Sequence, residues 1–525
     1  MNPRTCKALA SAAALLFVAA AGCTDTTVEP VSTITSANIF SDPSSYQKFL
    51  AKIYAGLAVG GESSGDGRTD IQGIDGGFSQ YLRIYWESEE LPTDEAVLAW
   101  GDIGIPDMNT QTWNAFNVFP QSMYYRIMLQ ATWANEFLRQ TTDAQLASRG
   151  VSTALKATVQ QYRAEARFLR ALSYWHGIDL FGDIPLVTEN DPIGTPPAQS
   201  TRAIIYAYIV SELTAIQSQL PAPGASTYGR ATGPAASMLL AEVYLNAGVY
   251  TGTPAYSQAL AAAQAVISSG AYSIDPSYRH LFQADNNTSP EIIFAITQDG
   301  LRTQTYGGVN FIIHAACGGS MSPSASGIDG CWYGNRLKPE AYLRYDLVND
   351  GRASFFYTTG QTLDVSSISN FNAGYAAPKF ENVTSTGQPG SNPGFVDTDF
   401  PMFRLGEAYL IYAEANLRGG GGDAGQALTY VNALRERAYG NTSGDITAAQ
   451  MTLPFILDER GRELLWEAHR RTDLVRYGLF TGGSYIWSWK GGTSAGAATD
   501  AHLNIFPIPA TELVANPKLK QNPGY

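Results

Sequence analysis

The sequence predicts a mainly α fold, in which helical hairpins of the tetratricopeptide type carry a loop-rich, less regular portion with few short strands. Three stretches repeat apolar residues at helical spacing. Two pairs of helices, far apart in the chain, share a pattern typical of helical hairpins. A long segment between these pairs is rich in Gly, Ser, Asn and Pro and has only short β-like runs.

The chain begins with the pattern of a secretory signal peptide, residues 1–22. A positive region with Arg4 and Lys7 precedes a short apolar core and the small-residue cleavage site "AAG". Cys23 follows directly, as in bacterial lipoproteins whose N-terminal thiol is acylated. We expect a lipidated Cys23 that anchors the protein in a membrane, with residues 23–37 as a flexible tether. An ordinary signal with an incidental cysteine stays open, because Ala20 stands where such signals usually carry Leu.

Residues 38–525 are expected to form a single domain of acidic character. The whole chain has a formal net charge of −13, and loss of the two basic residues of the signal makes it more negative. An acidic surface excludes nucleic acid as a partner, since phosphates require basic patches. No stretch after the signal is apolar for long enough to span a membrane.

Apolar stripes at helical spacing predict the helices of the first half. One stripe runs from Tyr46 to Leu57, a second from Val159 to Leu172, and a third from Ile205 to Leu220. Each stripe leaves polar residues on the opposite side of the helix. These helices are therefore expected to bury one face against the rest of the domain.

The two hairpins come next. "AEVYLNAG" at Ala241–Gly248 is followed by a turn and "QAL", and "AEANLRGG" at Ala413–Gly420 is followed in the same way. Small residues at each crossing let the helices approach, and their outer faces need neighbours to complete burial. Because a long insertion separates the hairpins, the sequence predicts no tandem array. "GGGDAG" in the second hairpin is predicted to be a turn and not a dinucleotide-binding loop, since no strand precedes it.

Two regions, about 60–119 and 272–400, are predicted to be loop-rich insertions. The second contains the β-like runs "EIIFAITQ" and "VNFIIHAA". Loops on a rigid helical scaffold are where binding groups usually lie.

Cys317 and Cys331 enclose a short loop inside the second insertion. In an oxidising compartment such a pair forms a disulfide that adds about 3 kcal/mol in the entropic description. Two free thiols are the alternative, and a zinc site is disfavoured because no C-x-x-C spacing is present. The histidines also lack ligand spacing, so neither a metal nor another cofactor is indicated. They are His176, His280, His314, His469 and His502.

Motifs for catalysis are weak. G-x-S-x-G occurs around Ser63 and Ser494, but neither serine lies between the strand and the helix that a nucleophile elbow requires. A cluster of acids offers the two carboxylates that a glycosidase needs. The favoured interpretation is a solvated loop face. Its members are Glu87, Glu89, Glu90, Asp94 and Glu95.

Aromatic residues on the loops carry the strongest functional signal. Sugar rings stack their C–H faces on indole and phenol rings, while their hydroxyl groups hydrogen-bond to Asp, Asn and Arg. The candidate ligand-binding residues are Trp100, Asp102, Trp332, Tyr333, Asp75 and Arg83. Tyr81, Tyr85 and Trp86 run into a regular segment and are expected in the core.

Three further stretches resemble the SusD/RagB family of surface nutrient-binding lipoproteins. They are "YRAEARFLRALSYWHGIDLFGDIPLV", "DERGRELLWEAHRRTDLVRYG" and the closing "NIFPIPATELVANPKLKQNPGY". With the lipoprotein-like start and the first hairpin, the resemblance spans the mature chain in the family's order. Charged residues in the first two stretches are expected to join helices through ion pairs. They are Arg163, Glu165, Arg167, Arg170, Glu463, Arg470 and Arg471.

The resemblance implies a protein that binds and does not catalyse, at the outer face of the outer membrane. There it would form a lid over a SusC-like TonB-dependent transporter and capture oligosaccharides for import, without a cofactor. The family has no rigid ligand motif, so the resemblance assigns no binding residue. Two alternatives stay open: the same scaffold binding peptides or another nutrient, and a surface glycoside hydrolase that uses two of the clustered acids.

Overall fold

The computed structural model describes residues 39–40, 42–62 and 68–525. Cys23, the signal peptide, the tether and Ser63 lie outside the described residues. The chain divides into two units, Met1–Ser45 and Tyr46–Tyr525, and the account below concerns the second. Among the described residues, no helix has the length and apolar character needed to cross a membrane.

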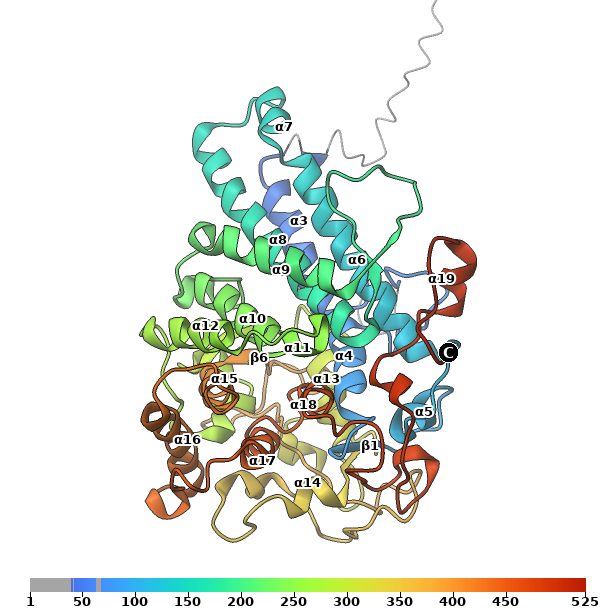
Figure 1. Ribbon diagram of the computed structural model, residues 1–525, viewed down its shortest axis with the longest axis vertical. Coiled ribbons are helices and arrows are strands. Elements are labelled where there is room, and N and C mark those ends of the chain that lie inside the picture. The colour runs from blue at the N-terminus through green and yellow to red at the C-terminus, as the bar shows by residue number, and fades with distance from the viewer. Residues whose placement is uncertain (1–38, 41, 63–67) are drawn as a thin grey trace, which may run out of the picture. The chain divides into compact units, whose positions relative to one another are not determined.

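Helices dominate the described chain, which confirms the predicted fold class (Figure 1). The three apolar stripes lie on α3, α8 and α9, and hydroxyl side chains cap α8 and α9 at their N-termini. The helices of the first half are α3 (Ser45–Ala58), α4 (Tyr81–Glu90), α5 (Ile105–Thr110), α6 (Val118–Gln140), α7 (Asp143–Ser148), α8 (Thr153–Phe181) and α9 (Arg202–Ile216). Those of the second half are α10 (Gly233–Leu245), α11 (Ala247–Thr251), α12 (Tyr256–Ser268), α13 (Gly308–Ala315), α14 (Pro339–Leu343), α15 (Leu405–Leu417), α16 (Ala424–Tyr439), α17 (Leu453–Glu463), α18 (Arg470–Arg476) and α19 (Ala510–Ala515).

Strands are few and short. Among the described residues they form three two-stranded antiparallel sheets. These pair β1 (Ala96–Leu98) with β5 (Asn335–Leu337), β2 (Ile184–Pro185) with β3 (Gln199–Ser200), and β4 (Ile292–Ile296) with β6 (Phe400–Arg404). The run "EIIFAITQ" contains β4, as predicted.

The second β-like run was wrongly interpreted. "VNFIIHAA" lies in helix α13, all eight residues of which are buried. A helix that is buried on every side has no exposed polar face to mark its period in the sequence, so a short run of this kind cannot be distinguished from a buried strand. The first loop-rich region also contains two helices, α4 and α5.

The two hairpins pack against each other, although the sequence predicted no array. α10 packs on α12, α15 packs on α16, and α12 packs on α15, which joins the hairpins into one layer (Figure 1). Small buried residues of α12, Ala259 and Ala263, line this region. The long insertion therefore separates the hairpins in the sequence but not in space.

The acidic cluster is buried, and the prediction of a solvated loop face is wrong. Its five carboxylates on α4 and the following turn are at most 1% exposed. Glu89 accepts hydrogen bonds from Thr472, Glu90 from the amide of Ala468, and Asp94 from Arg470. The cluster thus joins the first insertion to the C-terminal helices through charge-assisted hydrogen bonds.

Helix-to-helix ion pairs also form, as expected for the charged residues of these stretches. Arg167 and Arg170 of α8 pair with Glu212 of α9, and Arg471 pairs with Asp179. Arg163 instead donates to the carbonyl of Leu138 and to Thr141.

Candidate functional site

A strand pair brings together two aromatic residues that are far apart in the chain. In the β1–β5 ladder Leu98 lies opposite Asn335, and the amide of Ala99 donates to the carbonyl of Gly334 at 3.0 Å. Continuing this register by one residue on each strand places Trp100 beside the Trp332–Tyr333 segment. The Nε1 of Trp100 donates to the Trp332 carbonyl at 2.9 Å, which fixes the indole ring.

The two tryptophans form the centre of an aromatic cluster. Their ring centroids lie 6.3 Å apart with the rings tilted by 45°. Both rings are half-buried. Tyr306 extends the cluster, with its ring 6.1 Å from Trp332 in an edge-to-face arrangement and 5.7 Å from Phe395 in a stacked one. Because Tyr306 is 40% exposed, this cluster presents aromatic surface to solvent.

Arg83 packs against the rings of this aromatic region. Its guanidinium carbon lies 4.3 Å from the ring centroid of Phe311 and 5.3 Å from that of Trp100. The Nη1 donates to the carbonyls of Gly77 and Tyr306, at 2.9 and 3.5 Å. Among the described residues its Nη2 has no hydrogen-bond partner, which leaves one donor for a ligand.

Three acids lie around this arginine. Glu87, fully buried, accepts from the Nε of Arg83 at 3.0 Å. Burial raises the pKa of Glu87 to about 7, opposed by Arg83 and assisted by the nearby charge of Asp102. Asp102 itself is exposed, in the turn after Trp100. Asp75 is also exposed, and it connects to Arg83 through Gly77, whose amide donates to Asp75 at 2.7 Å.

Tyr333 does not join the tryptophans. Its ring is 52% exposed and packs edge-on against Phe371 at 5.7 Å, and its backbone adopts a left-handed conformation with φ of 56°. Trp332 packs on Trp100 and His314, whereas Tyr333 packs on Phe371, so the two side chains face different surroundings. Of the six candidates, the structure gathers Trp100, Trp332 and Arg83 directly.

Sequence reasoning missed Tyr306 and His314. His314 stacks on Trp332 with ring centroids 4.5 Å apart, and its Nδ1 donates to the Gly330 carbonyl at 2.8 Å. Burial lowers the pKa of His314, so the ring is neutral at physiological pH. Tyr306 precedes two glycines in a loop-rich segment, a signal that could have added it. The sequence contains no indication of the role of His314, because that role depends on its tertiary contact with Trp332.

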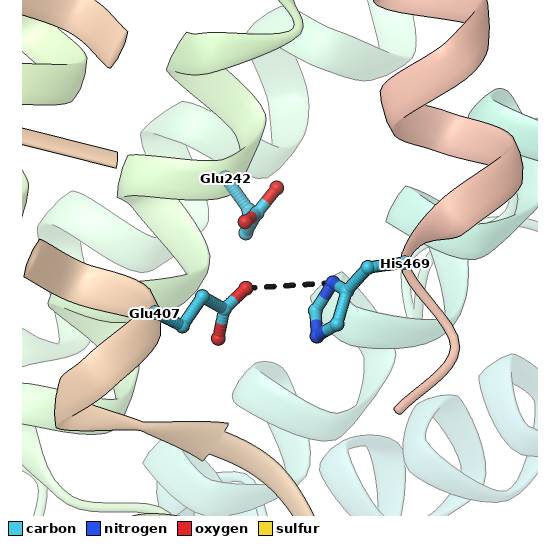
Figure 2. Close-up of side chains that lie close together, drawn as sticks. All are labelled: Glu242, Glu407 and His469. Carbon is cyan, nitrogen blue, oxygen red and sulfur yellow. Dashed lines mark ion pairs between the residues drawn. The ribbon is translucent and has the colours of Figure 1, made fainter. Parts of the chain in front are cut away.

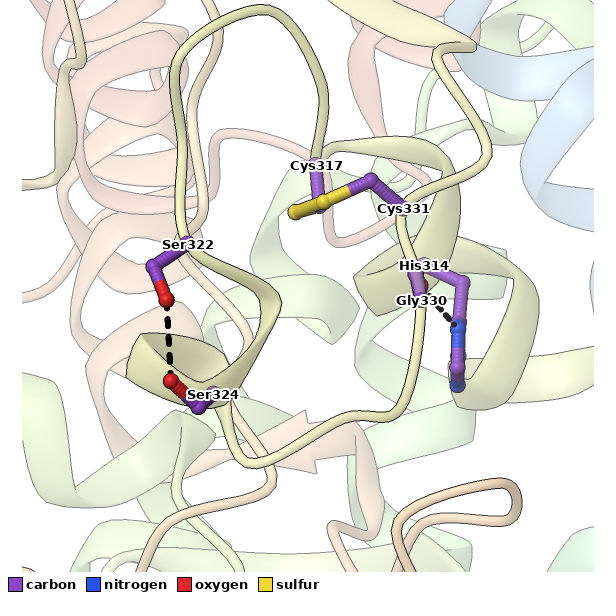
Figure 3. The surroundings of a disulfide bond; sticks show 6 residues. All are labelled: His314, Cys317, Ser322, Ser324, Gly330 and Cys331. Carbon is purple, nitrogen blue, oxygen red and sulfur yellow. Dashed lines mark hydrogen bonds between the residues drawn. A yellow bond between two sulfur atoms is a disulfide. The ribbon is translucent and has the colours of Figure 1, made fainter.

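A disulfide holds the loop that carries Trp332 (Figure 3). Cys317 and Cys331 are bonded, with Cα atoms 4.7 Å apart. The next three amides, of Trp332, Tyr333 and Gly334, donate to the carbonyls of His314, Cys317 and Ala315. This segment is therefore attached to the C-terminal end of α13 on both sides of the tryptophan.

The buried acids offer no glycosidase pair at this site. Asp94 and Glu95 are at most 1% exposed and are bonded to arginines, and Glu87 is paired with Arg83. A general acid or a nucleophile must reach the glycosidic oxygen or the anomeric carbon. What the cluster offers is stacking surface bordered by a guanidinium and exposed carboxylates.

Comparison with known proteins shows the family. The SusD family model matches residues 331–525. Starch-binding protein SusD of Bacteroides thetaiotaomicron is 34% identical over 573 aligned residues, covering 98% of both chains. The chain belongs to the SusD family. SusD-like protein P2 of Formosa agariphila is 26% identical, over 76% of this chain and 81% of that protein.

Solved structures share the fold. A SusD superfamily protein of Bacteroides vulgatus superposes with a TM-score of 0.71 at 18% identity, covering 92% of this chain and 99% of its own. Surface glycan-binding protein A of Bacteroides thetaiotaomicron, in complex with laminarihexaose, gives a TM-score of 0.69 at 21% identity, covering 91% and 98%. At these identities the likeness shows the fold alone.

Proposed function

We propose that this SusD-family protein binds oligosaccharides on the Trp100, Trp332 and Tyr306 rings and delivers them to a SusC-like TonB-dependent transporter. The observation that carries the binding proposal is the half-exposed aromatic cluster with Arg83 beneath it. The names of relatives support a carbohydrate ligand, since one is a starch-binding protein and another structure contains laminarihexaose.

The chemistry of the cluster suits sugars. Two tilted indoles and a phenol match the C–H faces of successive pyranose rings along a chain. The free Nη2 of Arg83 and the carboxylates of Asp102 and Asp75 supply a donor and acceptors for hydroxyl groups. Binding in this way needs no cofactor and no catalytic group, in keeping with a non-enzymatic role.

The anchoring and transport steps are part of the same proposal. Acylation of Cys23 would anchor the protein at the outer face of the outer membrane, where residues 23–37 would let it meet the transporter. Replacing Cys23 with Ser should release the protein from the membrane fraction. Affinity purification of the intact protein from outer membranes should recover a SusC-like transporter, and its repeated absence would contradict the delivery step.

Isothermal titration tests the ligand class. The protein is titrated with α- and β-glucan oligosaccharides and, separately, with basic peptides, which an acidic aromatic surface would also suit. Heat with a glucan is expected. Heat with peptides alone would support the alternative nutrient, and labelled glycan that is cut on incubation would support the hydrolase.

Single substitutions test the site. Trp100→Ala and Trp332→Ala should each weaken glycan binding by about 5- to 150-fold, the range of interface hot spots. Trp133→Ala is the matched control, because Trp133 on α6 is also half-buried but contacts Lys52 and not the cluster. Unchanged affinity in both cluster variants, with melting temperatures equal to that of the control, would refute this placement.

A further inference from the structure

Three buried side chains from distant segments converge, none of them a member of the aromatic cluster (Figure 2). Glu242 comes from α10, Glu407 from α15, and His469 from the residue before α18. One ligand atom of each lies within 4.8 Å of the others, and His469 Nδ1 is 3.5 Å from Glu407 Oε1. The site therefore lies where the two hairpins meet the C-terminal helices.

Within the described part of the chain, three of the four carboxylate oxygens of this group lack hydrogen bonds, while Oε2 of Glu242 accepts from Asn246 Nδ2 at 3.3 Å. Glu407 is 1% exposed, yet among the described residues neither of its oxygens has a hydrogen-bond partner. Oε1 of Glu242 is also without one. By contrast Glu463 of α17, which is fully buried, pairs with three arginines: Arg352, Arg404 and Arg437. Leaving a carboxylate buried and unpaired is costly, so Glu407 points to something that would occupy the space between the three side chains.

Neighbouring charges neutralise the group only in part. The nearest cation is Arg460 of α17, whose Nη2 lies 3.7 Å from Glu242 Oε1, beyond hydrogen-bond distance. Arg460 donates instead to Asp473 of α18 at 2.7 Å. The other charges around it, Arg476 and Glu414, pair with each other. Two carboxylates thus share at most part of one positive charge.

The ligand set matches a particular class of cation. One imidazole and two carboxylates are ligands that Zn²⁺ and similar divalent transition metals accept, whereas Mg²⁺ and Ca²⁺ prefer oxygen alone. Metal–ligand bonds of about 2.0–2.1 Å in a tetrahedron place ligand atoms about 3.3 Å apart, close to the separation of His469 and Glu407.

We propose that Glu242, Glu407 and His469 bind one divalent transition-metal cation, of which Zn²⁺ is the best match. The cation would join the two hairpins to the C-terminal helices, with water as a fourth ligand. Its role is structural and separate from the glycan site. No ligand spacing is visible in the sequence, because each ligand comes from a different part of the chain.

Metal analysis of the untagged protein tests the proposal. After treatment with a chelator and dialysis against ZnCl₂, we expect about one equivalent of zinc by mass spectrometry. At a hundredfold excess of Zn²⁺ over its Kd, the melting temperature should rise by about 2–3 °C above that of the chelated protein. Less than a tenth of an equivalent, without a thermal shift, would overturn the proposal and leave a proton shared between Glu242 and Glu407.

Substitutions locate the cation. Glu407→Gln keeps the shape of the side chain, removes a charged ligand and should lower zinc affinity at least a hundredfold. If this variant does not fold, His469→Gln serves, since the His469 side chain lies at the edge of the group with 8% exposure. The matched control is His280→Asn, which removes a histidine paired to one carboxylate, Asp275 at 2.7 Å. Undiminished zinc in the Glu407 or His469 variant would refute the site.

Discussion

Within the buried acidic cluster, substitution of Asp94 should lower the stability of the protein most. Its two oxygens accept hydrogen bonds from Arg470 Nε and Nη2 at 2.7 Å, from Arg344 Nη2 at 2.7 Å and from the Tyr485 hydroxyl at 2.6 Å. Asp94→Asn keeps the volume but removes the charge. Arg470 and Arg344, each at most 4% exposed, would then share the single anion Glu95.

The expected loss follows from the burial of both arginines. Breaking a buried ion pair on one side costs about 3–5 kcal/mol, because the remaining charge stays desolvated. The unit Tyr46–Tyr525 has an unfolding entropy of about 1 kcal/mol/K, from about 2.1 cal/mol/K per residue. The melting temperature should therefore fall by about 3–5 °C.

Differential scanning calorimetry measures this fall. Asp299→Asn is the matched control, because its partner Arg302 is 84% exposed and exposed pairs contribute little. That control should change the melting temperature by less than about 1 °C. A fall of the same size in Asp94→Asn as in the control would refute the reasoning.

The pH dependence gives a second check on Asp94. Burial by itself would raise the pKa of Asp94, but Arg470 and Arg344 lower it below its usual value. The native pair therefore contributes its full stability above about pH 4, the pKa of an unfolded Asp, and loses it as the pH falls further. The difference between wild type and Asp94→Asn should shrink below pH 4, and a constant difference would contradict this assignment.

Three other changes have expected outcomes. Gly461→Ala should lower the melting temperature by about 1–3 °C, because the new Cβ would lie 2.5 Å from Arg344 Nη1. This clash outweighs the higher helix propensity of Ala. An unchanged melting temperature would show that the Arg344 side chain can move aside without loss of stability. Cys331→Ser should lower the free energy of unfolding by about 3 kcal/mol, since the disulfide closes a loop with a sequence separation of 14. It should also weaken glycan binding, measured by calorimetric titration. Unchanged glycan affinity would show that the binding site does not depend on the disulfide. Glu87→Gln should become more stable relative to wild type as the pH rises from about 4 to 7. Native Glu87 has a pKa of about 7 and keeps a proton that the unfolded chain releases, so wild type loses stability over this range. A difference in melting temperature that does not change with pH would refute the effect of burial on Glu87.

Local patterns determined much of this protein. Apolar spacing predicted α3, α8 and α9, because a helix that buries one face records its period in the sequence. The hairpins were recognisable for the same reason. Trp100, Trp332 and Arg83 were selected as candidates from residue type and loop context. The family was inferred from three stretches that resemble it.

Tertiary structure decided what depends on distant partners. The acids from Glu89 to Glu95 looked solvated because the arginines that are buried with them lie hundreds of residues later, directly after α14 and on α18. Glu87 differs, because its partner Arg83 lies on the same helix. The sequence also could not show that α12 packs on α15, that Tyr306 and His314 join Trp332, or that Glu242, Glu407 and His469 meet. A helix records its own period in neighbouring residues, whereas contacts between segments depend on how the whole chain packs, and no local pattern encodes that.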